Sequence, residues 1–192
     1  MGKTKRQRVL ESAQKLFLHF GFQRTTLVDI ARESHVSRPT LYAMYEGKEQ
    51  IFAAVMDYYA DKLLAEIRQR TQKKDDLFEI LMIFFEIAVL RPYEQMSGTT
   101  FYKDLFELQD DRIRESLLSA SERFHSSLTK LLERCDQARL QQTGMSHAVL
   151  ARVLLNSVHG IKDKSESIEE LQIRIKGLVN LTCLALSHPP SP

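Results

Sequence analysis

The sequence is poor in the residues that interrupt helices. Its 192 residues include only 7 glycines and 5 prolines, and three of the prolines lie in the last four positions. Folds rich in β-strands need many turns that contain glycine or proline. The scarcity of both residues therefore predicts a chain that is mostly helical, long enough for one large domain or two small ones.

Paired cysteines and long apolar runs are also missing. Cys135 and Cys183 are the two cysteines, and neither belongs to a pattern with metal-ligand spacing. This predicts free thiols in a reducing compartment and no metal site. The longest apolar candidate, residues 80–90, is interrupted by Glu86, so no segment reaches the roughly 18 residues of a membrane span. The basic N-terminus lacks the apolar run of a signal peptide, and we expect a cytoplasmic protein that does not enter a membrane.

Catalytic patterns are absent as well. The sequence has no nucleophile elbow, no phosphate-binding glycine loop and no paired carboxylates in an apolar setting. His125, His147 and His159 lie in helical patterns without an assignable partner. We therefore expect no catalytic residue and no cofactor, and an enzyme is the weakest of three functional hypotheses.

The charge that is present is unevenly distributed. The net charge is +2, with +4 in residues 1–50 and −2 in residues 51–192. Basic charge collected at one end is what a phosphate-binding module beside a neutral domain would show, although a modest basic segment often has no such role.

The basic end has the pattern of three short helices. Apolar residues at helical spacing predict a helix over residues 4–20, which Gly21 ends. Thr26 followed by Asp29 resembles a capping box and starts a second helix, which ends near residue 34. After a turn at residues 35–36, Ser37 caps a third helix that ends near Tyr45, with Pro39 tolerated in its first turn.

The rest of the chain is predicted to form longer helices. The segment 77–90 is apolar on nearly all sides and must be buried, and Arg91–Pro92 is expected to end it. A loop is expected over residues 162–167 and a frayed tail after residue 186. The other expected helices cover residues 48–73, 99–108, 110–139, 146–160 and 168–186.

Residues 9–52 resemble the N-terminal DNA-binding domain of the TetR family of transcriptional regulators. The shared positions combine several residue types at fixed spacing, which makes the match specific, although it covers only about a quarter of the chain. They are Phe20-Gly21-Phe22, Thr25-Thr26, Asp29-Ile30-Ala31, Val36-Ser37, Thr40-Leu41-Tyr42, Tyr45 and Lys48-Glu49.

The sequence departs from the family pattern in the turn and in the third helix. Ser34-His35-Val36 stands where Ala-Gly-Val is common, and histidine tolerates a positive φ better than most residues. Pro39 replaces a common glycine, and Met44-Tyr45 replaces His-Phe. These departures alter the surface offered to bases, so the operator sequence of a relative does not transfer.

The resemblance implies a set of DNA-binding residues: Thr26, Val28, Ser37, Arg38, Pro39, Thr40, Tyr42, Tyr45 and Lys48. Thr26 and Lys48 would contact phosphates, and Arg38 would read a guanine with two hydrogen bonds. The alternatives are a simple helix cap for Thr26, a solvated lysine for Lys48 and a core position for Tyr45. A basic arm of Lys3, Lys5 and Arg6 could reach adjacent phosphates.

Large adaptable side chains gather in the middle of the chain. In proteins that resemble this one, the central helices enclose a ligand cavity, and methionine and phenylalanine suit a small apolar or amphipathic molecule. The alternative is a plain packed core. The candidate ligand-binding residues are Met82, Phe85, Met96, Phe101, Tyr102, Phe106, Phe124 and His125.

The last helix is apolar on two sides, so one side can cover the core while another meets a second copy. Together with the small-residue helix 148–160 it suits a four-helix dimer interface. The predicted interface residues are Val153, Ser157, Leu171, Leu178, Thr182 and Ala185.

The sequence thus predicts an all-α protein. Residues 1–47 would form a helix-turn-helix DNA-binding domain, and residues 48–192 a helical effector-binding and dimerisation domain. The leading hypothesis is a homodimeric repressor that binds double-stranded DNA with a palindromic operator and is released by an unidentified small ligand. The alternative is a regulator or scaffold controlled by a partner protein, with no small-molecule pocket.

Overall fold

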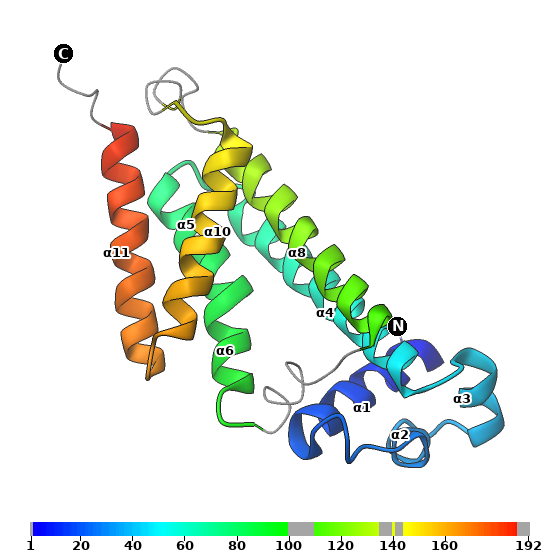
Figure 1. Cartoon of the computed structure of the whole chain (residues 1–192). Helices are drawn as coiled ribbons and strands as arrows, with labels where there is room; N and C mark the ends of the chain where they lie inside the picture. Colours follow the sequence, from blue (N-terminus) through cyan, green and yellow to red (C-terminus); the bar gives the residue numbers. More distant parts are fainter. Residues whose placement is uncertain (1, 100–109, 135–139, 141–143, 188–192) are drawn as a thin grey trace. The chain divides into compact units, whose positions relative to one another are not determined.

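The computed structural model describes residues 2–99, 110–134, 140 and 144–187, and the prediction of an all-α protein is confirmed (Figure 1). No strand occurs in these residues, and none of their helices is both long and apolar enough to cross a membrane. The described helices are α1 (Lys5–Phe20), α2 (Leu27–Glu33), α3 (Arg38–Met44), α4 (Lys48–Thr71), α5 (Leu77–Phe85), the π-helix η1 (Glu86–Leu90), α6 (Arg91–Met96), α8 (Asp111–Leu132), α10 (His147–Asp163) and α11 (Ile168–Ser187).

The chain divides into two compact units. The first consists of Met1–Lys62 and Gln95–Ala120, and the second of Leu63–Glu94 and Ser121–Pro192. The division falls inside α4 and not at its beginning, because Ile51 on the first turns of α4 is buried in the same core as α1. The unit that contains the three N-terminal helices is therefore larger than residues 1–47.

Three aromatic rings occupy the centre of the first core. Phe17 of α1, Phe22 of the following loop and Phe52 of α4 lie with ring centroids 5.2 to 5.5 Å apart. All three side chains are almost completely buried, and burying a phenylalanine contributes about 1.5–3 kcal/mol. This cluster fixes the position of α4 relative to α1. Helix α1 also contacts α2.

The second core forms around α5. Ile80, Leu81, Phe84 and Phe85 are buried, as the apolar sequence of this segment predicts. Helix α11 contacts α5, η1 and α10. It does so through Leu171, Ile175, Val179, Thr182 and Leu186, which are buried at helical spacing along one of its faces.

The prediction that Arg91–Pro92 ends the helix is wrong. The chain stays helical to Met96, and the turn before Pro92 widens into the π-helix η1. In η1 the N–H of Arg91 donates to the carbonyl oxygen of Glu86, five residues earlier. Proline has no N–H and its ring crowds the carbonyl four residues before it, so a wider turn lets the helix continue past Pro92.

Two other boundaries differ from the prediction. Helix α8 ends at Leu132, and Arg134 in the following turn donates to the carbonyl oxygens of Thr71 and Lys74 at the end of α4. Residues 135–139 and the predicted helix 99–108, apart from Thr99, lie outside the described residues. Helix α10 extends to Asp163, three residues beyond the predicted end at Gly160.

Candidate nucleic-acid interface

Helix α2 begins with the predicted reciprocal cap. The Thr26 hydroxyl oxygen accepts a hydrogen bond from the Asp29 N–H (3.2 Å), and the Asp29 carboxylate accepts one from the Thr26 N–H (3.3 Å). The Thr26 hydroxyl also donates to this carboxylate, and that bond is the main reason why the pKa of Asp29 lies below its usual range. Thr26 is exposed, so its hydroxyl lies at the surface of the helix N-terminus.

The turn between α2 and α3 is a Schellman motif with histidine at the left-handed position. His35 has φ +51°, its N–H donates to the Arg32 carbonyl (3.2 Å), and the Val36 N–H donates to the Ala31 carbonyl (3.0 Å). These two bonds satisfy carbonyls that a helix end leaves unpaired. The buried Ser34 hydroxyl adds a third bond to the Ile30 carbonyl (2.7 Å). The turn therefore holds without the common glycine.

Helix α3 is fixed at both ends of its first turn. The Ser37 hydroxyl oxygen accepts a hydrogen bond from the Thr40 N–H (3.3 Å) and lies 2.8 Å from the Thr40 hydroxyl oxygen. Pro39 occupies the first turn, where no N–H is needed. Leu41 is buried against the core, which leaves the opposite side of this seven-residue helix uncovered.

That uncovered side carries most of the predicted DNA-binding residues. Arg38 and Pro39 are exposed, and 55% of the Tyr42 side chain is accessible. Val28, on the exposed side of α2, is 36% accessible. A planar cation, a phenol and small apolar groups are thus presented together by two short, capped helices, which is the chemistry that base edges and phosphates require.

Tyr45 does not belong to this surface, so its predicted role as a DNA-binding residue is corrected to that of a core residue. Its side chain is 7% accessible and packs in the core of the first unit. Its hydroxyl is buried and has no hydrogen-bond partner in the described part of the chain. The residue ends α3 in an extended conformation, which directs the ring inward.

Lys48 has a structural contact that the sequence did not reveal. Its ammonium donates to the carbonyl oxygens of Phe22 (2.7 Å) and Gln23 (3.2 Å), and it lies 4.3 Å from the centre of the Phe22 ring. The lysine at the start of α4 therefore holds the loop between α1 and α2. A phosphate contact by Lys48 would be made from this anchored position.

The predicted basic arm is partly helical and partly paired. Thr4 caps α1 through a capping box with Gln7, so Lys5 and Arg6 are exposed in the first turn of a helix. Lys3 pairs with Glu11 at 2.7 Å. The hydrogen bond from Lys3, followed by those from Lys62 and Tyr58, lowers the pKa of Glu11 from 4.5 to about 2.

The segment with this geometry matches a known family. Residues 9–55 match the model described as bacterial regulatory proteins of the tetR family. This N-terminal region therefore resembles the DNA-binding region of TetR-family regulators. A region of 61 residues is 39% identical to the HTH-type transcriptional repressor ComR of Escherichia coli and covers 32% of this chain. This alignment covers 29% of ComR, so the chain spans less than a third of that relative.

Two further matches extend over nearly the whole chain. The uncharacterized HTH-type transcriptional regulator YfiR of Bacillus subtilis is 24% identical over 96% of this chain and 91% of its own length. A candidate transcriptional regulator from Saccharomonospora viridis, solved in complex with choline, has a TM-score of 0.69 at 17% identity. That match covers 91% of this chain and 95% of the other, and at this identity it shows the fold alone.

Five of the eight predicted ligand-binding residues lie in the described part of the chain, and their surroundings differ. Phe85 is fully buried against Phe84, which also contacts the half-buried Phe124. Met96 packs against the N-terminal core, and its assignment to a ligand site stays a prediction. His125 is held between the Ala148 carbonyl (2.9 Å) and Arg152 (3.2 Å). The remaining three, Phe101, Tyr102 and Phe106, lie outside the described residues.

Met82 is different, because it lines an open groove in the second unit, which we call the apolar groove. This groove has a volume of about 840 Å³ and lies between α4, α5, η1 and α11. Helix α5 contributes Phe78, Glu79, Met82 and Ile83 to its lining. Its lining consists of Arg70, Lys74, Phe78, Glu79, Met82, Ile83, Glu86, Leu90, Gln172, Ile173 and Lys176.

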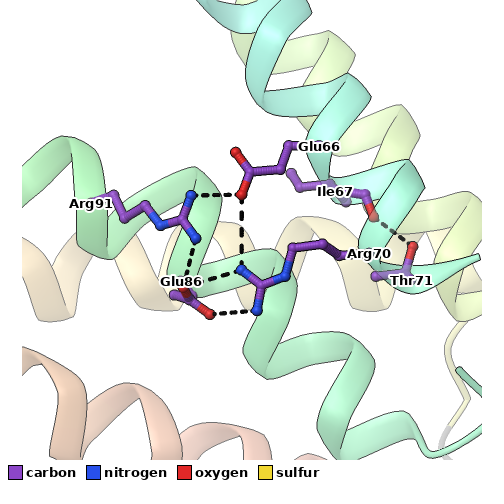
Figure 2. A network of polar contacts seen from close by, with 6 residues as sticks. All are labelled: Glu66, Ile67, Arg70, Thr71, Glu86 and Arg91. Carbon is purple, nitrogen blue, oxygen red and sulfur yellow. Dashed lines mark hydrogen bonds and ion pairs between the residues drawn. The ribbon is translucent and has the colours of Figure 1, made fainter.

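Two of these residues also belong to an ion network that joins α4 to the π-helix (Figure 2). Arg70 pairs with both carboxylate oxygens of Glu86 at 3.2 Å, and Arg91 joins Glu86 (2.8 Å) to Glu66 (2.6 Å). The hydrogen bond from Arg70, and then that from Arg91, lowers the pKa of Glu86. The four side chains are each about a third exposed, so each pair contributes at most about 1 kcal/mol.

The predicted dimer residues divide into two groups. Leu171 and Thr182 are buried within the protomer, so their assignment to an interface is wrong; they lie on the face of α11 that packs on α5 and α10. Val153 and Ala185 are exposed, and Ser157 and Leu178 are half-buried. The large apolar side chains that α11 leaves exposed are Ile173 (72%), Leu181 (67%) and Leu184 (56%).

No group of three or more potential metal ligands occurs among the described residues. Burial and the nearby charge of Asp76 raise the pKa of the Cys183 thiol.

Proposed function

We propose that this protein is a homodimeric DNA-binding repressor that a small ligand releases from a palindromic operator. The observation that carries the proposal is the uncovered face of α3, where Arg38, Pro39 and Tyr42 are exposed on a helix fixed by Ser37. The partial match to a repressor and the family of the N-terminal region support it. We propose this regulatory role in preference to a catalytic one.

The individual contacts follow from side-chain chemistry. Arg38 would donate two hydrogen bonds to a guanine, and Tyr42 and Thr40 would contact the backbone or a thymine methyl group. Thr26 lies at the N-terminus of α2, where the helix end favours a phosphate. Val28, Ser37 and Pro39 would complete the surface, and Lys48 would reach a phosphate while it holds the preceding loop.

The proposed dimer uses α10 and α11. Ile173, Gly177, Leu181 and Leu184 recur along one exposed face of α11, separate from the face that packs in the core. Val149 (49% accessible) and Val153 (45%) are exposed on α10. Because an apolar face of this kind is costly in water, we propose that the same face of a second copy covers it. Two recognition helices would then lie about 34–36 Å apart, in successive major grooves.

Two glycines support close packing of the helices in this dimer. Gly160 of α10 and Gly177 of α11 lie within helices, and a Cβ added at either position would meet no atom within 4 Å. A glycine inside an exposed helix costs about 1 kcal/mol relative to alanine. Nothing within the protomer requires that cost, whereas a helix of a second copy could approach closely at these positions.

We propose the apolar groove as the site of ligand control. Phe78, Met82 and Leu90 contribute apolar side chains to the groove lining. Arg70 and Glu86 also line the groove, and they belong to the ion network. A ligand that binds better to one arrangement of this network would shift the protein toward the conformer with that arrangement. The choline complex of a protein with the same fold is consistent with a small-molecule ligand in this fold.

Control by a partner protein is the second candidate. It is favoured by the packing of Phe84 against Phe85 and Phe124, three aromatic side chains in the part of the chain where the sequence predicts a cavity. Native mass spectrometry of the purified protein separates the two candidates. A co-purified small molecule supports ligand control, and an empty dimer that binds a second protein from its own cells supports partner control.

The test of DNA binding is a titration of the full chain against the intergenic DNA upstream of its own gene, followed by fluorescence anisotropy. We expect an affinity that falls by at least about tenfold between roughly 50 and 200 mM salt and exceeds that for a scrambled duplex. Arg38→Ala should weaken specific binding by at least about tenfold. The matched control is Arg114→Ala, which removes the same charge from an exposed position on α8. Equal affinity for the two duplexes, or equal effects of the two substitutions, would contradict the proposal.

A further inference from the structure

A second groove in the second unit has a different chemistry, and we call it the basic groove. It lies between the C-terminal half of α4 and α8, which run side by side (Figure 1), and has a volume of about 620 Å³. Each helix contributes one continuous face. The lining residues are Leu64, Ile67, Arg68, Thr71 and Gln72 from α4 and its end, and Arg123, Ser126, Ser127, Lys130, Leu131 and Arg134 from α8 and the turn after it.

The charge of this lining has one sign. It contains Arg68, Arg123, Lys130 and Arg134, and no aspartate or glutamate is among the described residues that line it. In the apolar groove, by contrast, the carboxylates of Glu79 and Glu86 are themselves part of the lining. Arg68 and Lys130 form no ion pair in the described part of the chain, and an anion bound in this groove would interact favourably with both.

One of the four cations has a structural role. Arg134 donates to the carbonyl oxygens of Thr71 (2.8 Å) and Lys74, and pairs with Asp75 at 3.5 Å. It therefore ties the turn after α8 to the end of α4 and closes one end of the groove. Ile67, Thr71 and Leu131 are buried and form a fixed floor. The groove is thus preformed, which lowers the entropic cost of binding.

The other cations surround two hydroxyl groups. Arg123, Ser126, Ser127 and Lys130 follow the spacing of one helix face, within about 10 Å along the axis of α8. Arg68 lies across the groove on α4. Within the described part of the chain, Arg68 and Lys130 form no ion pair, and Ser126 and Ser127 form no side-chain hydrogen bond. Guanidinium, ammonium and hydroxyl donors on a short segment match the oxygens of a phosphate.

A favourable interaction with the helix dipole explains only part of this arrangement. Cations near the C-terminal end of a helix are stabilised by its dipole, which accounts for Lys130 and Arg134. Arg123 lies in the middle of α8, more than two turns from its end, and gains nothing from that effect. The dipole also does not explain why the lining lacks a carboxylate.

We propose that the basic groove binds a small molecule that carries two or more linked phosphate groups. Arg68 would engage the ligand from α4, while Arg123, Lys130 and the two serines would engage it from α8. The bound anion would link the two helices. This site is distinct from the apolar groove and does not depend on the identity of the operator or of the releasing ligand.

The test uses the full-length protein and inorganic pyrophosphate, with binding measured by isothermal titration calorimetry and by the shift in Tm. We expect saturable binding at one site per protomer and a rise in Tm with pyrophosphate concentration. Sulfate at equal ionic strength should have a smaller effect. The double variant Arg68→Gln/Lys130→Gln should weaken pyrophosphate binding by at least about tenfold, because two charge-assisted contacts are removed. Both side chains are exposed, so the variant should keep the fold.

The matched control is Arg114→Gln/Lys164→Gln, which removes one arginine and one lysine charge from exposed positions outside both grooves and should leave pyrophosphate binding unchanged. Absence of pyrophosphate binding to the wild type, or equal losses in the two double variants, would overturn the proposal. So would a basic groove that binds nucleic acid instead. That outcome would appear as weaker DNA binding by Arg68→Gln/Lys130→Gln without any effect of pyrophosphate. Because the titration contains no DNA, its result is independent of the proposed repressor function.

Discussion

The helix pair α2–α3 and the helix pair α10–α11 each leave one face uncovered, and the two faces have opposite chemistry. Helix α3 exposes Arg38 and Tyr42 beside a proline. Helix α11 exposes Ile173, Leu181 and Leu184 beside a glycine. The first face suits a charged partner with hydrogen-bonding edges, and the second suits an apolar surface of matching shape. Under the proposed function, one protomer would therefore have separate surfaces for DNA and for a second copy.

The two pairs also differ in how they are held. Helices α2 and α3 have seven residues each, and hydrogen bonds at their ends fix their boundaries. Helix α11 has twenty residues, and its position is fixed by the side chains buried along its length. Short helices depend on caps because few side chains are buried, whereas long helices depend on the core.

The largest effect is expected from placing a charge on the apolar face. Leu181→Glu should dissociate the dimer, because two glutamates would meet at the two-fold interface, and DNA affinity should fall by about 100-fold or more as the second half-site is lost. Analytical ultracentrifugation and anisotropy measure the two effects. Leu118→Glu on α8 is the control, since Leu118 is 62% accessible and Leu181 is 67% accessible. An intact Leu181→Glu dimer would place the interface elsewhere.

Substitutions of two tyrosines test which residues belong to the exposed face of α3. Tyr42→Ala should weaken DNA binding by about tenfold, since it removes an exposed contact next to Arg38. Tyr45→Phe should leave DNA affinity within about twofold of the wild type and stabilise the fold by about 1 kcal/mol, because it removes a buried hydroxyl that lacks a partner. Anisotropy and chemical denaturation provide the measurements. Weaker DNA binding by Tyr45→Phe would mean that the Tyr45 hydroxyl contributes to DNA binding.

Gly177→Ala tests whether close approach matters on the apolar face. Alanine should stabilise the isolated protomer by up to about 1 kcal/mol, because it favours the helix and its Cβ meets no atom within 4 Å. The same methyl group should weaken the dimer several-fold by separating the two helices. Thermal unfolding at low protein concentration gives the first quantity and sedimentation the second. An unchanged dimer constant would mean that no helix crosses at Gly177.

The smallest effect concerns the ion pair of the basic arm. The pKa of Glu11 is lowered from 4.5 to about 2, so its ionised form stabilises the fold above pH 4.5, and that contribution is lost as the pH falls toward 2. Because Lys3 and Lys62 are more than half exposed, we expect about 1 kcal/mol at neutral pH. Urea denaturation of Glu11→Gln should therefore show lower stability at pH 7 and a difference that disappears near pH 2. A constant difference at all pH values would contradict this origin.

Local rules allowed the N-terminal helices to be predicted from the sequence. The caps at Thr26 and Ser37 and the turn at His35 depend on residues within a few positions, so the pattern alone located them. Other features depend on distant partners. Near Pro92, Arg91 forms a hydrogen bond with Glu66, which lies 25 residues earlier in the sequence. The face of α11 that is buried is the one that contacts α5 and α10. Leu171 and Thr182 were misplaced because an apolar helix does not reveal which side meets its own core.

The π-helix determines the angular phase of α6, the helix that continues from it. A π-turn contains about one residue more than an α-turn, so η1 acts as a one-residue insertion in an otherwise regular helix. Successive residues of an α-helix are separated by about 100° around the axis, and the extra residue therefore rotates all of α6 by that angle relative to α5. Arg91 faces Glu66 in the phase that results. The direction of every side chain in α6 is thus set by a single surplus residue between Glu86 and Leu90.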